Sequence, residues 1–210
     1  MIGNKIGHRL DPVLHTLLKK IFGNGKNPNL FTWTAFFVTL IASFFILMEY
    51  WILTGLAILL SGLFDLLDGA AARITGRVTL FGGLLDSVLD RYSDLFLMTA
   101  LLFHYLKKNE PGLVILTSFV SIGIALIPYV RAKAEAAQIP CKVGLMERAE
   151  RIILLSIGAL FQLMEPILWI MVVLCHFTVL QRIHHVWKEL HPPLKNQEIR
   201  NPNFETRNKS

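Results

Sequence analysis

The stretch DLLDGAAARITGRVTLFGGLLDSVLD, residues 65–90, places four aspartates among apolar segments long enough to cross a lipid bilayer. These aspartates are Asp65, Asp68, Asp86 and Asp90. An uncompensated charge at bilayer depth costs about 3 kcal/mol or more, and intramembrane carboxylates are rare unless something holds them. Four carboxylates in this position therefore need a partner, and a divalent cation is the obvious candidate.

The rest of the chain predicts a membrane protein. Of its 210 residues, 53% are apolar and 17% are charged. A helix needs about 20 residues to cross the hydrocarbon core, and each apolar block, extended through its flanks, can form one crossing. We therefore expect an all-α integral membrane protein with six transmembrane helices in a single domain over residues 27–190. The blocks are 30–49, 51–64, 95–106, 113–130, 152–164 and 166–180.

The two ends of the chain differ from this domain. Residues 1–26 contain apolar side chains at helical spacing between Leu10 and Ile21, which predicts an interfacial amphipathic helix. They do not resemble the short start of a cleaved signal peptide. Residues 191–210 form a polar, proline-interrupted tail. Cys141 and Cys175 suggest neither a disulfide framework nor a metal cluster.

Lysine and arginine gather in alternate connections. They are frequent before residue 27, in residues 73–77, in residues 131–151 and after residue 181, whereas the intervening connections hold only Lys107 and Lys108. This bias predicts a multi-pass protein of the cytoplasmic membrane with both termini on the cytoplasmic side. The net charge of +6 is explained by topology and suits anionic membrane lipids; no nucleic-acid motif accompanies it.

The spacing of the aspartates predicts that they converge. Asp65 and Asp68 lie about 60° apart on a helical wheel, and Asp86 and Asp90 share a face of the next helix. The connection between the helices is short, so we expect antiparallel neighbours whose carboxylates meet near the cytoplasmic side. All-oxygen ligands suit Mg²⁺ or Mn²⁺, and two such ions would balance four carboxylates.

Small residues surround the acidic face. They allow a ligand, or simply another helix, to approach the backbone closely. Both interpretations stay open for these residues taken alone. They are Gly69, Ala70, Ala71, Ala72, Gly82 and Gly83.

The aspartates and these small residues together carry a resemblance. The pattern is Asp65-x-x-Asp68-Gly69-x-x-Ala72-Arg73, then eight residues, then Gly82-x-x-x-Asp86-x-x-x-Asp90. It is similar to the complete signature of the CDP-alcohol phosphotransferase family. The chain length and the six-span layout extend this resemblance over all but the tail.

The resemblance implies an enzyme of phospholipid biosynthesis, of the EC 2.7.8 type, that works as a homodimer. An alcohol attacks the phosphorus next to the lipid part of a CDP-linked donor, and CMP leaves. Asp65, Asp68 and Asp86 would hold the metal ions. Asp90 would be the catalytic base and would also touch one ion. Donor binding would involve Asp65, Asp68, Gly69, Ala72, Arg73 and Gly82.

Basic residues suggest the acceptor. Segments 129–136 and 144–152, together with LLDSVLDRYSD (84–94), resemble the bacterial phosphatidylinositol-phosphate synthases and their archaeal archaetidylinositol-phosphate counterparts. The donor would then be CDP-diacylglycerol or its archaeol analogue, and the acceptor myo-inositol phosphate. Asp94 is expected to orient Arg91 or an acceptor hydroxyl, or to serve helix packing. The residues expected to bind the acceptor phosphate are Arg131, Lys133, Arg148, Arg151 and Arg182.

Other functions remain to be weighed. Glycerol 3-phosphate is an alternative acceptor, since basic residues serve it equally. A cation or proton transporter also uses intramembrane carboxylates, but it predicts inverted repeats that are not apparent here. A metal-dependent membrane phosphatase would use water as the nucleophile. A scaffold without activity is hard to reconcile with four intact aspartates.

Overall fold

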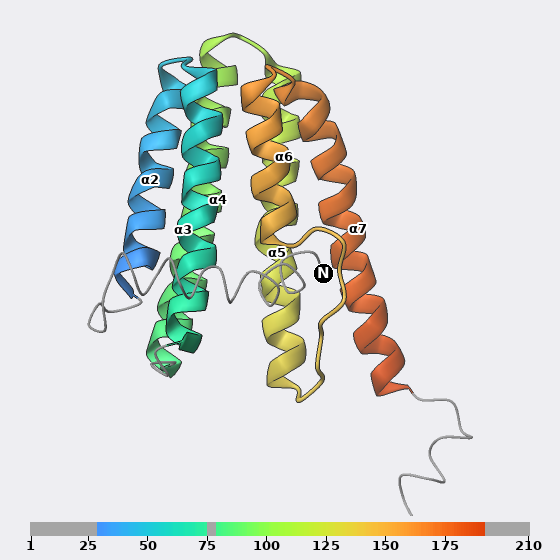
Figure 1. Cartoon of the computed structure of the whole chain (residues 1–210). Coiled ribbons are helices and arrows are strands. Elements are labelled where there is room, and N and C mark those ends of the chain that lie inside the picture. Colours follow the sequence, from blue (N-terminus) through green and yellow to red (C-terminus); the bar gives the residue numbers. More distant parts are fainter. Residues whose placement is uncertain (1–28, 75–78, 192–210) are drawn as a thin grey trace, which may run out of the picture.

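The computed structural model describes residues 29–74 and 79–191, and side chains within 71–74 are not described. The described chain forms long helices that run up and down side by side (Figure 1). The expected interfacial helix before residue 27, the side chains of Ala72 and Arg73, and the tail after His191 lie outside the described residues. The helices are α2 (Asn29–Leu47), α3 (Trp51–Ile74), α4 (Leu80–Lys107), α5 (Pro111–Ala136), α6 (Arg148–Leu160) and α7 (Met164–Leu190).

Tight turns join the helices at one end of the bundle. Glu49, Asn109 and Gln162 each adopt a positive φ of 55° to 61° just after a helix, a conformation that ends helices. Lys108 Nζ donates a hydrogen bond of 2.9 Å to Glu49 Oε2, which ties two of these turns together. This bond also lowers the pKa of the exposed Glu49 carboxyl.

Four helices are long and apolar enough to span a membrane: Asn29–Leu47, Trp51–Ala70, Pro111–Ala136 and Met164–Leu190. The prediction of a multi-pass all-α membrane protein is therefore confirmed, and four of the six expected crossings meet this criterion. The two other helices differ for physical reasons. In α4, charged residues between Asp86 and Asp94 interrupt the apolar sequence. With 13 residues, α6 is about 20 Å long, less than the hydrocarbon thickness of about 30 Å.

The described helices pack in a closed ring. In order around it, α2 contacts α3, α3 contacts α6, α6 contacts α7, α7 contacts α5, α5 contacts α4, and α4 contacts α2 again. Buried side chains from all six helices fill the middle, among them Met98, Leu101, Val120 and Leu168. Each helix therefore has two neighbours, and several pairs that adjoin in sequence are separated in space.

One expectation is wrong in detail. The backbones of α3 and α4 run antiparallel, but they do not pack directly against each other; α2 packs against both. The short connection between α3 and α4 predicts direct contact. Instead, a space separates the two helices, and the aspartate side chains meet in it. The separation of α3 and α4 therefore makes room for the site.

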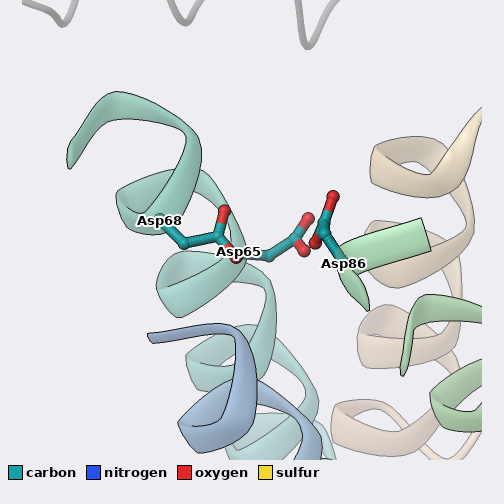
Figure 2. A group of neighbouring side chains, drawn as sticks. All are labelled: Asp65, Asp68 and Asp86. Carbon is teal, nitrogen blue, oxygen red and sulfur yellow. The ribbon is translucent and has the colours of Figure 1, made fainter. Parts of the chain in front are cut away.

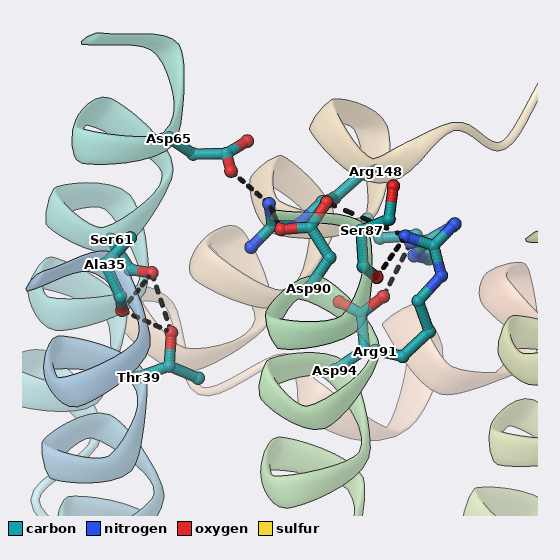
Figure 3. A network of polar contacts seen from close by, with 10 residues as sticks. Ala35, Thr39, Ser61, Asp65, Ser87, Asp90, Arg91, Asp94 and Arg148 are labelled. Carbon is teal, nitrogen blue, oxygen red and sulfur yellow. Dashed lines mark hydrogen bonds and ion pairs between the residues drawn. The ribbon is translucent and has the colours of Figure 1, made fainter. Parts of the chain in front are cut away.

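Close contacts fix the position of α3. A Cβ at Gly62 would lie 2.9 Å from Ile152 Cγ2 of α6, so glycine allows these two helices to approach. On the other side, Ser61 Oγ lies 2.6 Å from Thr39 Oγ1 and donates to Ala35 O of α2 at 2.9 Å (Figure 3). The end of α3 that carries Asp65 is thus held by α2 and by α6.

Candidate active site

Three aspartates meet across the space between α3 and α4. Asp65 and Asp68 reach from α3 toward Asp86 on α4 (Figure 2). Each can offer one carboxylate oxygen such that all three oxygens lie within 4.8 Å of one another. The convergence arises because the helical spacing puts Asp65 and Asp68 on one face, and because α4 begins its antiparallel return at Leu80.

Two carboxylate oxygens of this group accept no hydrogen bond from the described residues. Asp68 is only 8% exposed. Its Oδ2 and the Oδ1 of Asp86 are buried and have no hydrogen-bond partner among the described residues. Buried carboxylate oxygens without a partner are costly unless a cation or a donor meets them. The donor set, three carboxylates and no sulfur or imidazole, fits Mg²⁺ or Mn²⁺.

The fourth aspartate has a different partner. Asp90 lies one helical turn beyond Asp86 on α4 and is not part of the group of three. It is paired with Arg148, whose Nη1 also donates to Asp65 (Figure 3). The structure therefore places Asp90 beside the other aspartates, but against a guanidinium.

A second arginine of α6 is paired with an aspartate inside the bundle. Arg151 Nη2 donates to Asp94 Oδ2 at 2.6 Å, and both side chains are less than 10% exposed. The partner of Asp94 is thus Arg151 and not Arg91, which was one of the expected partners. Arg91 donates instead to the Ser87 carbonyl at 2.6 Å, and its Nη1 lies 3.9 Å from Asp90 Oδ2.

The segment before α6 is fastened to α7. Residues 137–147 connect α5 to α6, and we call them the strap. The Met146 amide donates to Thr178 Oγ1 at 3.0 Å, and Arg182 Nε donates to the Val143 carbonyl at 2.8 Å. Because the strap ends next to Arg148, these bonds help to fix where α6 begins and therefore the position of Arg148.

The strap makes a third contact with α7, and Arg182 makes a second hydrogen bond. His185 Nε2 lies 3.1 Å from the Pro140 carbonyl oxygen. Arg182, only 2% exposed, also donates from Nη1 to the Ile127 carbonyl at 2.6 Å. Thr178, Arg182 and His185 recur every three or four residues, so one face of α7 makes all these contacts.

The five residues expected to bind an acceptor phosphate have different partners in the structure. Arg148 and Arg151 lie at the start of α6 beside aspartates, and Arg182 lies beneath the strap. Arg131 and Lys133 are on the exposed part of α5, where Arg131 Nε pairs with Glu135 at 2.8 Å.

Sequence reasoning missed a cavity between α4 and α5. Its volume is about 830 Å³, and its polar lining residues include Ser87, Arg91, Tyr92, Tyr129 and Arg131. No local motif marks it, because it depends on how residues 84–95 of α4 and residues 125–135 of α5 are turned toward each other. Arg91 connects this cavity to Asp90.

Two of the glycines expected near a donor can be placed. Gly69 is partly buried on α3. At the start of α4, the Gly82 amide donates to Thr79 Oγ1 at 3.0 Å, which caps the helix. A Cβ at Gly82 would lie 2.9 Å from that oxygen, so a larger residue would disturb the cap.

Comparison with known proteins identifies the family. Residues 26–180 match the family model for CDP-alcohol phosphatidyltransferase. The archaetidylinositol phosphate synthase of Pyrococcus horikoshii is 32% identical over 188 residues, which cover 89% of this chain and 97% of that protein. The phosphatidylinositol phosphate synthase of Mycobacteroides abscessus is 36% identical over 140 residues, covering 63% of this chain and 64% of that protein.

Solved structures show the same fold. The crystal structure of Mycobacterium tuberculosis phosphatidylinositol phosphate synthase (PgsA1) with CDP-DAG bound has a TM-score of 0.73 at 29% identity and covers 84% of this chain and 92% of that one. The same protein in complex with manganese and citrate has a TM-score of 0.72, again at 29% identity, and covers 84% and 88%. The chain therefore belongs to the CDP-alcohol phosphatidyltransferase family, enzymes that transfer a phosphatidyl group from a CDP-linked lipid.

Proposed function

We propose that this enzyme transfers the phosphatidyl-type group of CDP-diacylglycerol or CDP-archaeol to a hydroxyl of myo-inositol phosphate. One observation carries the proposal: an all-carboxylate group with unpartnered buried oxygens lies next to Arg148 of α6, and Arg151 follows about one helical turn later. The carboxylates suit a metal-bound diphosphate, and the arginines suit a phosphorylated acceptor. The relatives named as inositol phosphate synthases support this choice of acceptor.

The metal site would be formed by Asp65, Asp68 and Asp86, with Asp90 beside a second ion. The chemistry that two divalent ions supply when bound is neutralisation of the charge on the diphosphate and on the departing CMP. Gly69 and Gly82 are assigned to the donor by the family signature, as are Ala72 and Arg73.

The proposed reaction assigns a role to each of these side chains. Asp90 accepts the proton of the acceptor hydroxyl. The hydroxyl oxygen bonds to the phosphorus nearest the lipid, the bond from that phosphorus to the oxygen of CMP breaks, and CMP leaves with the electron pair. Arg148 and Arg151 are the nearest candidates for the acceptor phosphate, with Arg182, Arg131 and Lys133 around them.

The same proposal includes the arrangement in the membrane. All six helices cross the bilayer within one domain over residues 27–190, and both termini and the active site face the cytoplasm. The distribution of lysine and arginine supports this orientation. We also propose that the enzyme is a homodimer, as the family resemblance implies.

The test is an acceptor panel. Purified enzyme in detergent is given a CDP-lipid and either inositol phosphate, inositol, glycerol 3-phosphate or serine, and CMP and the lipid product are measured by mass spectrometry. Inositol phosphate should give the highest kcat/KM. A higher kcat/KM with glycerol 3-phosphate would show that glycerol 3-phosphate, and not inositol phosphate, is the acceptor. CMP release without any alcohol would indicate hydrolysis. Activity should disappear with excess chelator and return with Mg²⁺ or Mn²⁺.

A further inference from the structure

Arg148 is shared between two helices of the site. Its Nη1 donates simultaneously to one oxygen of Asp65 on α3 and one oxygen of Asp90 on α4 (Figure 3). The three side chains are 15%, 24% and 17% exposed, so the contacts are largely shielded from water. Since α3 and α4 do not pack directly, this arginine forms a polar bridge between them.

Asp65 belongs to two groups at once. It is one of the three aspartates whose oxygens lie within 4.8 Å, and it is also a partner of Arg148. A guanidinium and a divalent cation are attracted to the same negative oxygens, and two positive charges in one small buried space repel each other. The Arg148 guanidinium and a metal ion therefore compete for the oxygens of Asp65.

No other described arginine of α6 can take over this role. Arg151 is paired with Asp94 in a buried contact of 2.6 Å. Arg91 lies 3.9 Å from Asp90 and is 43% exposed, so water weakens its attraction. Arg148 is therefore the principal positive charge of the described residues inside the aspartate group.

We propose that Arg148 is an internal cation, which holds Asp65 and Asp90 together while the site is metal-free and which a divalent ion displaces on binding. The inference rests on the metal site of the proposed function. The side chain is able to move because Arg148 is the first residue of α6 and has a long, flexible stem. Its buried Nε has no partner among the described residues and is a spare donor for the acceptor phosphate once the bridge opens.

This mechanism imposes an order on the site. A positive charge that belongs to the protein lies between the carboxylates of Asp65 and Asp90 and offsets their mutual repulsion. Metal binding then releases that charge toward the acceptor. The arginine would thus become available for a phosphate when the metal is in place.

The experiment is a Mn²⁺ titration of the full-length enzyme in detergent, without substrate, followed by electron paramagnetic resonance. Arg148→Met keeps the length of the side chain but removes the competing charge. It should bind Mn²⁺ about 10-fold more tightly than the wild type, because two charge-assisted hydrogen bonds no longer oppose the ion. Arg148→Lys, which retains the charge but lacks the planar fork, should fall between the two.

Lys108→Met is the control, since Lys108 is exposed and pairs with Glu49 at the turns, outside the aspartate group. Its Mn²⁺ affinity should equal that of the wild type. An unchanged or weaker affinity in Arg148→Met, with normal binding by the wild type, would overturn the inference and leave the proposed function intact. If the wild type and all variants fail to bind Mn²⁺, the metal-dependent function fails as well.

A thermal readout guards against a folding artefact. The bridge stabilises the metal-free protein, so Arg148→Met should lower Tm without metal and recover much of that loss when Mn²⁺ is added. The upward shift of Tm with Mn²⁺ should therefore be larger in Arg148→Met than in the wild type. An equal or smaller shift would contradict displacement.

Discussion

Asp90 and Asp68 occupy one acidic site but differ in their surroundings. Asp68 has a buried oxygen without a partner and belongs to the group of three, whereas Asp90 faces Arg148. Asp90→Asn should therefore lower kcat by about 10²- to 10⁴-fold, the usual effect of losing a general base. Its Mn²⁺ affinity should stay within a few-fold of the wild type.

Asp68→Asn provides the contrast. It removes a charge from the three-carboxylate group, so Mn²⁺ affinity and donor affinity should both fall. The two variants can be compared by Mn²⁺ titration and single-turnover CMP release. Wild-type turnover in Asp90→Asn would show that Asp90 is not the base. An equal loss of Mn²⁺ affinity in Asp90→Asn and Asp68→Asn would show that Asp90 is a principal metal ligand.

Arg151, which we propose as a ligand of the acceptor phosphate, is the residue whose test needs the most care. Alanine would leave Asp94 buried and unpaired, at a cost of about 3–5 kcal/mol in stability. Arg151→Lys preserves the charge for Asp94 but loses the bidentate fork. It should raise the KM for inositol phosphate about 10-fold, with a smaller change in kcat and in the KM for the donor.

Unphosphorylated inositol is the control substrate for Arg151→Lys. If Arg151 binds the phosphate, any weak use of inositol should be little changed. Equal damage to both substrates would show that the pair of Arg151 and Asp94 serves helix packing.

At the level of helices, the contact between α3 and α6 is tight at Gly62. A methyl group there would lie 2.9 Å from Ile152 Cγ2, which is close to the backbone and cannot simply swing away. Gly62→Ala should therefore destabilise the protein by about 1–3 kcal/mol and lower Tm in detergent. Gly83→Ala is the control, because a Cβ at Gly83 has nothing within 4 Å.

A second substitution can separate crowding from other effects. Ile152→Ala removes the group that a Cβ at Gly62 would meet, so Gly62→Ala combined with Ile152→Ala should lose less stability than the sum of the single variants. Additive losses would contradict a direct contact between these positions.

The strap is the other element whose role can be measured. Thr178→Val keeps the shape of the side chain but removes the oxygen that accepts from the Met146 amide. A buried amide without a partner costs about 1–3 kcal/mol. Hydrogen exchange of residues 140–147 should become faster, as followed by mass spectrometry. Thr117→Val is the control, since the hydroxyl of the buried Thr117 donates to the Leu113 carbonyl of its own helix.

For the whole molecule, the sequence predicts the parts better than their arrangement. Helical spacing and the family signature together indicate that Asp65, Asp68 and Asp86 belong to one site, because these inferences depend on short-range periodicity. The bridge from Arg148 to Asp65 spans 83 residues. The order of helices around the ring, the space between α3 and α4 and the cavity beside Arg91 depend on packing that no local pattern encodes.

The short α6 has a consequence for the surrounding lipid. Its outward-facing Ile153 and Ile157 lie on a helix of 13 residues, and the strap brings polar backbone into the same side of the bundle. This flank fits a membrane thinner than about 30 Å, and mismatch costs a fraction of a kcal/mol per Å. In vesicles with acyl chains of about 14, 18 and 22 carbons, turnover should be highest in the thinner bilayers at equal donor density. Turnover independent of chain length would contradict this. If turnover does depend on chain length, bilayer thickness is a physical regulator of phospholipid synthesis, and α6 is the element that responds to it.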